Sequence, residues 1–221
     1  SDIIKLFTAG TSRFEIAADG SLSTPTPGTS NVRFGSGAGI ALASGGIYNV
    51  IVGDQAGDLL TTGDNNIAIG YRALDAEDTG SSNVAIGSWA LSALNYDGNG
   101  YNTAVGYLAG EDITTGIENT LIGALAGDAL TDADYNVAVG KSALSTDTKG
   151  NRSVAIGQSA LHAQNFTTST SSYNTAVGDG AGLSVTTGIH NIIVGGLAGD
   201  ALTDADYNVV VGVGALTTDT L

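Results

Sequence analysis

One nine-residue pattern recurs eleven times along this chain and constrains its fold more than any other feature. The pattern is Asn-x-x-(Ile/Val)-Gly-x-x-Ala-(Leu/Gly), and its copies start at residues 31, 49, 66, 83, 102, 119, 136, 153, 174, 191 and 208. Glycine and alanine keep their places in every copy, whereas asparagine is replaced once, by Ser153, and the Ile/Val position once, by Phe34. Self-similarity at a short, nearly fixed period is typical of a repeat architecture, so the chain is expected to stack equivalent units.

The spacing of the copies shows a second, longer period. Most repeat glycines are 17 residues apart, but two intervals are 19 and 21 residues long. The residue that closes the motif runs in pairs, Gly, Gly, Leu, Leu, and both long intervals follow the second Leu copy. The larger unit is therefore a block of four copies, which explains why 128–144 and 200–216 match at fourteen of seventeen positions.

Each copy holds a short apolar segment between Asn and Gly, and β-branched residues dominate its outer positions, which favours a strand. No copy shows the three-to-four spacing of a helix, and glycine recurs too often for one. The sequence predicts an all-β fold, a parallel β-solenoid of about eleven 17-residue turns over 31–221. Residues 1–30 are expected to form a strand, a turn and a linker that caps this domain or joins it to another.

The repeat residues have expected structural roles. Asparagine tolerates the left-handed backbone of a corner, and stacked amides can form a hydrogen-bonded ladder. Glycine supplies a positive φ or a close backbone approach, and alanine fills a narrow interior. The structural set includes Asn66, Gly70, Ala73, Asn83, Gly87, Ala90, Asn136, Gly140, Ala143, Asn208, Gly212 and Ala215.

The middle residue of each short segment is also apolar, with Arg33 as the exception. Strands that are apolar on both faces are buried on both faces. One face is expected to pack inside its own turn. The other face, mostly alanine, is expected to meet identical rods around a common axis, which favours a homotrimer over a monomer.

The segments NIAIG (66–70), NVAIG (83–87) and SVAIG (153–157) resemble the NSVAIG-type repeat of YadA-type trimeric adhesin heads. The resemblance covers about 31–216 and implies a left-handed parallel β-roll, three copies of which form the head. Similar repeats occur in fibre and receptor-binding proteins of tailed phages. The chain is thus expected to be a structural and adhesive segment of a phage fibre, located on the virion or outside the cell.

The expected partners are its own copies, other fibre or virion domains, and a host cell-surface glycan or protein receptor. The head of a bacterial trimeric autotransporter-like adhesin is the alternative function. A solenoid that binds ice or a mineral is a further one, although ice binders of this shape array threonines on a flat strand face, whereas these segments carry Ala, Val and Ile.

Composition excludes several other classes of function. The net charge is −15, from 7 basic and 22 acidic residues, so neither nucleic acid nor an anionic membrane surface is an expected partner. There is no cysteine, which removes disulfides and thiolate chemistry. No apolar run is long enough for membrane insertion.

The sequence offers little chemistry. No phosphate-binding loop motif occurs, and His162 and His190 lie in different copies without a nucleophile at a motif-like spacing, so no enzymatic activity and no cofactor are expected. Asp128, Asp132 and Asp134 are weak candidates for a calcium site, because carboxylate oxygens are ligands of that ion. Their spacing does not match an EF-hand loop.

The two long intervals correspond to SALNYDGNGY (92–101) and HAQNFTTSTSSY (162–173). Stacked strands cannot absorb extra residues, so these segments should bulge outward as loops. Both loops combine aromatic and small polar residues. Tyr96, Tyr101, Phe166 and Tyr173 are therefore candidate receptor contacts, since aromatic faces with amides and hydroxyls suit a neutral glycan.

Overall fold

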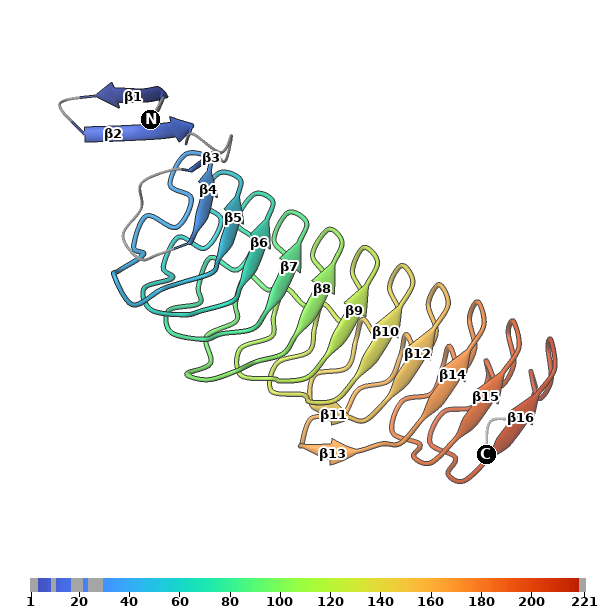
Figure 1. Ribbon diagram of the computed structural model, residues 1–221. Coiled ribbons are helices and arrows are strands. Elements are labelled where there is room, and N and C mark those ends of the chain that lie inside the picture. Colours follow the sequence, from blue (N-terminus) through green and yellow to red (C-terminus); the bar gives the residue numbers. More distant parts are fainter. Residues whose placement is uncertain (1–3, 9–10, 17–21, 24–29, 219–221) are drawn as a thin grey trace.

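The computed structural model shows a rod of stacked turns (Figure 1) and describes residues 4–8, 11–16, 22–23 and 30–218. One strand per turn joins an eleven-stranded parallel sheet, in which neighbours pair middle residue to middle residue without a register shift. The described residues contain no helix. The predicted parallel β-solenoid of about eleven turns is confirmed. Its strands are β4 (Val32–Phe34), β5 (Val50–Val52), β6 (Ile67–Ile69), β7 (Val84–Ile86), β8 (Thr103–Val105), β9 (Thr120–Ile122), β10 (Val137–Val139), β12 (Val154–Ile156), β14 (Thr175–Val177), β15 (Ile192–Val194) and β16 (Val209–Val211).

The first residues form a separate small sheet. Strands β1 (Ile4–Thr8), β2 (Thr11–Ile16) and β3 (Leu22–Ser23) pair antiparallel in that order. Most of the predicted linker lies outside the described residues, so its role as a cap or a junction stays a prediction. The described part of the chain contains no helix with the length and apolarity that crossing a bilayer requires.

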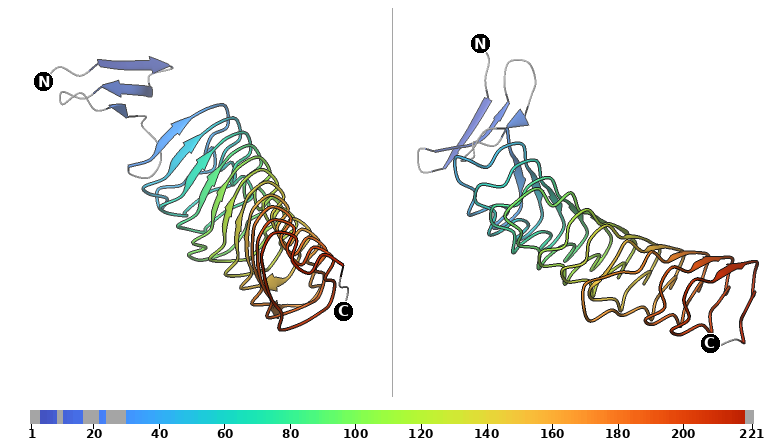
Figure 2. Two further views of the ribbon diagram at one scale, coloured as in Figure 1. Left: turned by 90° about the vertical axis from the view of Figure 1, so that its right-hand side faces the viewer. Right: turned by 90° about the horizontal axis from the view of Figure 1, so that it is seen from below.

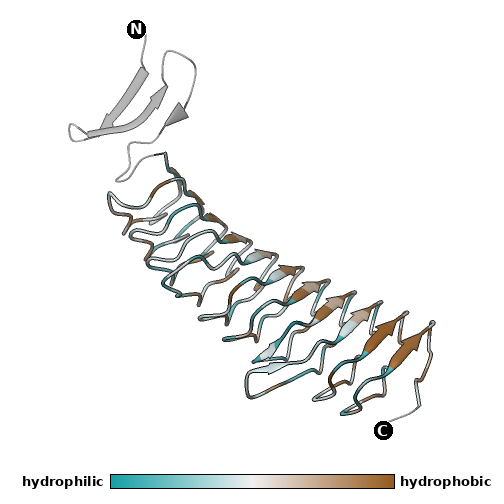
Figure 3. Cartoon of the chain, turned by 60° about the horizontal axis from the view of Figure 1, so that its bottom comes forward, coloured by the Kyte–Doolittle hydropathy of each residue, from teal (hydrophilic) through white to brown (hydrophobic). Residues whose placement is uncertain are grey.

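The middle residue of each strand points into the coil. From β5 to β16 of the large sheet it is buried, whereas the Val, Ile and Thr residues on either side of it are half-buried or exposed. Ala68, Ala85 and Ala138 are fully enclosed. The expectation that an alanine-lined face meets other rods is therefore wrong, because a small residue is what fits the narrow interior. The outward stripe consists of β-branched residues, and Figure 3 shows apolar strands along one side of the rod.

Buried asparagines connect successive turns by a side-chain-to-backbone ladder. In Asn66, Oδ1 accepts the N–H of Asn83 at 2.9 Å, and Nδ2 donates to the carbonyl of Gly80 at 2.8 Å. Equivalent bonds recur in most other turns. One amide therefore satisfies two buried backbone groups that the turn itself leaves without partners.

The left-handed corner lies one residue earlier than expected. In every turn the residue before the repeat asparagine, or before Ser153, has a φ between 49° and 65°, and the asparagine itself does not. This corner position holds Tyr, Ser, Asn, Glu, Arg and His residues. The asparagine is thus required for its hydrogen bonds and not for its backbone conformation.

The repeat glycine meets both of its expected requirements. Its φ is 126° to 146° in all eleven turns. A Cβ on Gly157 would lie 2.3 Å from the carbonyl oxygen of Gly178 in the next turn, a distance that no packed structure tolerates. The glycines therefore form a column in which each backbone passes directly over the next.

In several turns the residue that closes the motif is matched in size to the middle residue of the strand. Where Leu144 closes the motif, the middle strand residue is Ala138, and both are fully buried. Where Gly127 closes it, the middle residue is Leu121, whose Cδ2 would lie 2.8 Å from a Cβ on Gly127. Turns with Leu121 or another Ile or Leu in the middle of the strand thus carry the glycine, because a densely packed coil has room for only one of the two side chains. Gly110 follows the small Ala104 instead, and there a Cβ would lie 2.7 Å from Leu121 of the next turn.

Ser153, the one exception to the asparagine column, is compensated by its neighbours. Its Oγ lies 2.6 Å from the Ser172 Oγ and accepts from Nε2 of Gln164 at 2.8 Å. Gln164 Oε1 in turn accepts from Nδ2 of Asn174 at 2.8 Å. Both partners, Gln164 and Ser172, belong to the expanded segment 162–173, and successive turns remain stacked on both sides of it (Figure 2).

Candidate functional site

Both expanded segments leave the coil at the same place in successive four-turn blocks. In the second block, β11 (Gly150–Asn151) and β13 (Thr170–Ser171) pair in parallel and extend the loop from the lower edge of the rod in Figure 1. In the first block a single bridge between Ser81 and Asn99 occupies the equivalent place. The prediction that the extra residues bulge outward is confirmed.

The first aromatic residue of each loop is an anchor. Phe166 is only 7% exposed, and the ring of Tyr96 packs against the hydrophobic core. The candidate role of Phe166 as a receptor contact is therefore wrong, because its ring is enclosed by the loop base. Tyr96, partly buried, offers only part of its surface.

The last aromatic residue of each loop lies outside. Tyr101 is 57% exposed and Tyr173 is 50% exposed. Both occupy the corner position before a repeat asparagine, where the positive φ directs the side chain away from the coil. Thr167, Thr168 and Ser169 at the tip of the second loop are also exposed. A ligand of the loops would therefore meet hydroxyl groups and one tyrosine ring per loop.

Five planar side chains at corner positions form a column in the second half of the rod. The Arg152 guanidinium carbon lies 4.7 Å from the ring centroid of Tyr135 and 5.9 Å from that of Tyr173. His190 is stacked between Tyr173 and Tyr207, at centroid distances of 5.3 and 4.8 Å. Stacking occupies most ring faces, so the column presents mainly ring edges and polar tips.

Sequence reasoning missed this column. Its signal was present, since Tyr135, Arg152, Tyr173, His190 and Tyr207 each precede a motif start. Only the stacking of turns brings residues 17 or 21 positions apart into contact, because adjacent strands lie about 4.8 Å from each other.

Trp89 has a local role. Its ring meets that of Tyr71 edge to face at a centroid distance of 5.5 Å, and the Arg72 guanidinium carbon lies 4.8 Å from its centroid. Arg72 is itself held by Gln55 Oε1 at 2.9 Å and by Asp75 at 3.7 Å. The residues of this cluster follow their strands in the sequence, whereas those of the tyrosine column precede theirs, so the two groups lie at opposite ends of the strands.

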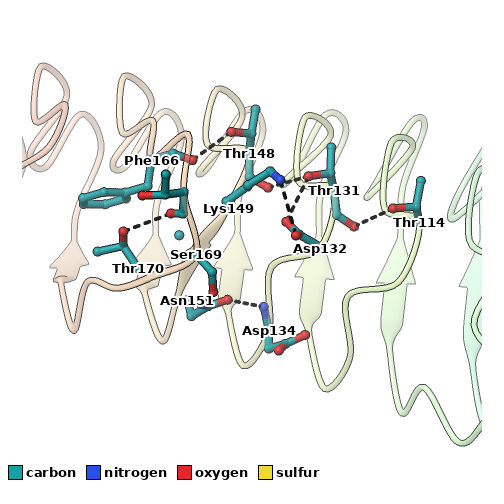
Figure 4. A network of polar contacts seen from close by, with 12 residues as sticks. Thr114, Thr131, Asp132, Asp134, Thr148, Lys149, Asn151, Phe166, Ser169 and Thr170 are labelled. Carbon is teal, nitrogen blue, oxygen red and sulfur yellow. Dashed lines mark hydrogen bonds and ion pairs between the residues drawn. The ribbon is translucent and has the colours of Figure 1, made fainter.

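The three aspartates considered as calcium ligands, Asp128, Asp132 and Asp134, have different surroundings, and Figure 4 shows two of them, Asp132 and Asp134. Asp132 pairs with Lys149 at 3.4 Å, and Asp134 Oδ1 accepts the N–H of Ile117 at 2.9 Å. Asp128 is half-buried, its Oδ1 has no hydrogen-bond partner, and burial raises the pKa of its carboxyl. No group of three or more metal-binding side chains forms within the described ranges. Asp128, Asp132 and Asp134 are thus not assembled into a calcium site.

A threonine column runs beside these acids. Thr114 Oγ1 donates to the carbonyl of Thr131 at 3.3 Å, Thr131 Oγ1 to that of Thr148 at 3.0 Å, and Thr148 Oγ1 to that of Phe166 at 2.8 Å (Figure 4). These hydroxyl protons connect one turn to the next. They are therefore used within the rod and cannot at the same time be donated to an ice or mineral surface.

The fold and these surfaces define a parallel β-solenoid repeat protein that carries two loop-bearing turns. Searches of protein-family models, curated proteins and solved structures found no significant match to the chain.

Proposed function

We propose that this chain is a structural and adhesive segment of a tailed-phage fibre, in which three left-handed rolls associate lengthwise and display their loops to a host surface. The proposal is supported by one observation above all: the outward face of the sheet is an apolar stripe along the whole rod. One of its two columns, from Phe34 to Val211, is apolar throughout, and the other is interrupted only by Thr103, Thr120 and Thr175. The number of copies, the handedness and the phage setting come from the resemblance of NVAIG and its variants to the repeats of trimeric adhesin heads and phage fibres.

The stripe is made by the two outward residues of each strand. Ile122 is 41% exposed, Ile156 38% and Ile192 46%. Ten steps of about 4.8 Å give the stripe a length of roughly 48 Å. Soluble monomers rarely expose contiguous apolar patches of this extent, and such patches mark interaction surfaces.

A second copy of the chain suits this stripe better than an unrelated partner. The stripe has the same period in every copy, so parallel rods match it turn for turn. Cyclic symmetry about an axis parallel to the rod covers the stripe of each protomer and leaves no copy unpaired. The expanded loops emerge from the coil edge and not from the strands, so they remain free for contact in such an assembly.

The loops supply the adhesive part of the proposal. Each assembly displays every loop three times, and multivalent display raises avidity for a repetitive surface without any new contact. The host ligand is proposed to be a cell-surface glycan or protein that meets Tyr101, Tyr173 and the hydroxyls of the second loop.

Light scattering tests the assembly. We expect a mass of about three times 21.9 kDa and, for Ile156→Asp, a shift to the monomer, because a carboxylate would be buried in the shared core. Thr168→Asp adds the same charge at an exposed loop tip and should leave the mass unchanged. A wild-type monomer at micromolar concentration would overturn the proposal.

Whole-cell binding tests the adhesive role. Replacement of 162–173 by the corresponding residues of an ordinary turn, combined with Asp147→Leu and Ser153→Asn because the loop satisfies both buried residues, should leave the rod folded and reduce attachment. Unchanged attachment would remove the second loop from the recognition surface.

A further inference from the structure

An acidic residue interrupts an interior apolar column in the turn before each expanded loop. The column occupies the position seven residues after each repeat glycine, and its members are Leu42, Leu60, Glu77, Leu94, Ile113, Leu130, Asp147, Gln164, Val185 and Leu202. Glu77 and Asp147 are both 0% exposed. Burying a carboxylate is strongly unfavourable unless hydrogen bonds compensate, so the two acids require a structural reason.

Neither acid is neutralised by a cation. Over the described ranges, no lysine or arginine forms an ion pair with Glu77 or Asp147. Backbone N–H groups take the place of a cation. Glu77 Oε1 accepts from Gly80 at 2.7 Å and from Asp78 at 3.1 Å, and Asp147 Oδ1 accepts from Gly150 at 3.0 Å. These bonds shape the corner of the turn that carries the acid.

The remaining bonds reach the next turn, at the residue where the loop leaves the coil. Glu77 Oε2 accepts the N–H of Tyr96 at 3.3 Å, and Asp147 Oδ1 accepts the N–H of Phe166 at 2.9 Å. Tyr96 and Phe166 are equivalent residues of their loops, so the two blocks use the same contact. Gln164, also in the second loop, donates from Nε2 to Asp147 Oδ2.

The backbone N–H of the residue just before Tyr96 or Phe166 still takes part in the ladder of turns. Asn95 N still donates forward to the carbonyl of Thr114 at 2.8 Å, and Asn165 N to that of Thr186 at 2.9 Å. The next N–H, on Tyr96 or Phe166, donates backward to the carboxylate. In the described part of the chain, the equivalent N–H groups of Thr62, Asp132 and Thr187, which belong to ordinary turns, form no backbone bond to a neighbouring turn. The acid thus binds a backbone donor that the ladder of turns does not use, at the point where the loop leaves the coil.

We propose that Glu77 and Asp147 are positioning residues that hold loops 92–101 and 162–173 in one fixed conformation, so that the recognition surface is formed before the ligand arrives. The fixed loop is inferred from the contacts alone, and only its use in recognition rests on the proposed function. A loop already ordered in its binding conformation loses less entropy on association, and its ligand binds more tightly for that reason.

Amide hydrogen exchange on the full chain tests the positioning role. Asp147→Leu introduces the residue type that Leu130 supplies one turn earlier. Exchange at Phe166 and through 162–173 should accelerate by about tenfold or more, as expected for loss of a bond to a charged group. Loop 92–101 is the internal control and should not change, whereas Glu77→Leu should produce the reverse pattern.

Two results would overturn the proposal. One is unchanged exchange in 162–173 of Asp147→Leu. The other is equal acceleration in both loops and in the strands, which would indicate general destabilisation of the rod.

A second background keeps the test informative if Asp147→Leu fails to fold. In a rod whose segment 162–173 is replaced by an ordinary turn, Asp147→Leu should be neutral or stabilising, because the acid then has no loop to hold. A loss of thermal stability in that background would contradict the proposal. Host-cell binding separates the two ideas: a loosened loop with unchanged attachment would leave the positioning role intact and overturn the role of the loop in recognition.

Discussion

The asparagine column offers the sharpest test of how the rod is held together. In Asn119, which is fully buried, Nδ2 donates to the carbonyl of Ala133 at 2.8 Å and Oδ1 accepts the N–H of Asn136 at 2.9 Å. Asn119→Ala removes both bonds, as well as the bond from Nδ2 to Oδ1 of Asn102 at 3.1 Å, and leaves a backbone donor and a backbone acceptor unsatisfied inside the coil. Each unsatisfied buried group costs about 1–3 kcal/mol, so the free energy of unfolding should fall by about 2–6 kcal/mol.

Thermal unfolding followed by circular dichroism measures this change at a fixed protein concentration. For a chain of this length 1 kcal/mol corresponds to about 2–4 °C, so the melting temperature should fall by roughly 10 °C. Asn99→Ala is the matched control. It removes an exposed amide that donates to the Tyr101 hydroxyl at 3.0 Å, and its effect should stay within about 0.5 kcal/mol. Equal melting temperatures for the two variants would refute the ladder as a source of stability.

Asn119→Ser extends the test. Serine is tolerated at position 153 because Gln164 and Ser172 complete the network there. Position 119 has no such neighbours, so Asn119→Ser should be nearly as destabilising as Asn119→Ala. A serine variant as stable as the wild type would show that the compensation around Ser153 is unnecessary.

Three further predictions concern other parts of the fold. Gly157→Ala should prevent or strongly impair folding, seen as loss of a cooperative melt, whereas Gly212→Ala should be milder, because its Cβ meets nothing closer than 3.8 Å although both residues have a positive φ. Burial raises the folded-state pKa of Asp128, so its contribution to stability is present below the unfolded pKa of 3.8 and is lost as pH rises through the folded pKa. The melting temperature should therefore rise from pH 7 toward pH 4, and Asp128→Asn should flatten that slope; an identical slope would contradict the assignment. Ala138→Leu and Leu144→Gly should each destabilise the rod by about 1–5 kcal/mol, and the double variant should recover part of the loss in a urea-denaturation cycle. Simple additivity would show that the two positions do not share one interior volume.

Much of the fold can be predicted from the sequence because the same motif occurs eleven times. The period fixes one strand per turn, and the 19- and 21-residue intervals locate both loops. Glycine is required at Gly157 and its equivalents because the backbone of the next turn leaves no room for a Cβ, which holds in any stack of such turns. The predictions about individual side chains were wrong where the role of a residue depends on its contacts with a neighbouring turn.

The inward side of the strand is one such case. Both Ala138 and its neighbours Val137 and Val139 are apolar, so hydropathy alone does not say which of them faces the interior. The answer depends on the corner before each strand and on the interior width, both of which arise only when turns stack.

The candidate site divides in the same way. From the sequence, Phe166 and Tyr173 are equivalent aromatic residues of one loop. In the rod they have different environments. The Phe166 N–H donates to Asp147 on the preceding turn and its ring is buried. Tyr173 occupies a corner with a positive φ, and its ring lies outside the coil beside Arg152 and His190. The sequence by itself determined the period, the strands and the places of the loops, since these are properties of one turn. Tertiary structure decided which side chains face in, which face out and which loop residues are held, since these are properties of neighbouring turns in contact.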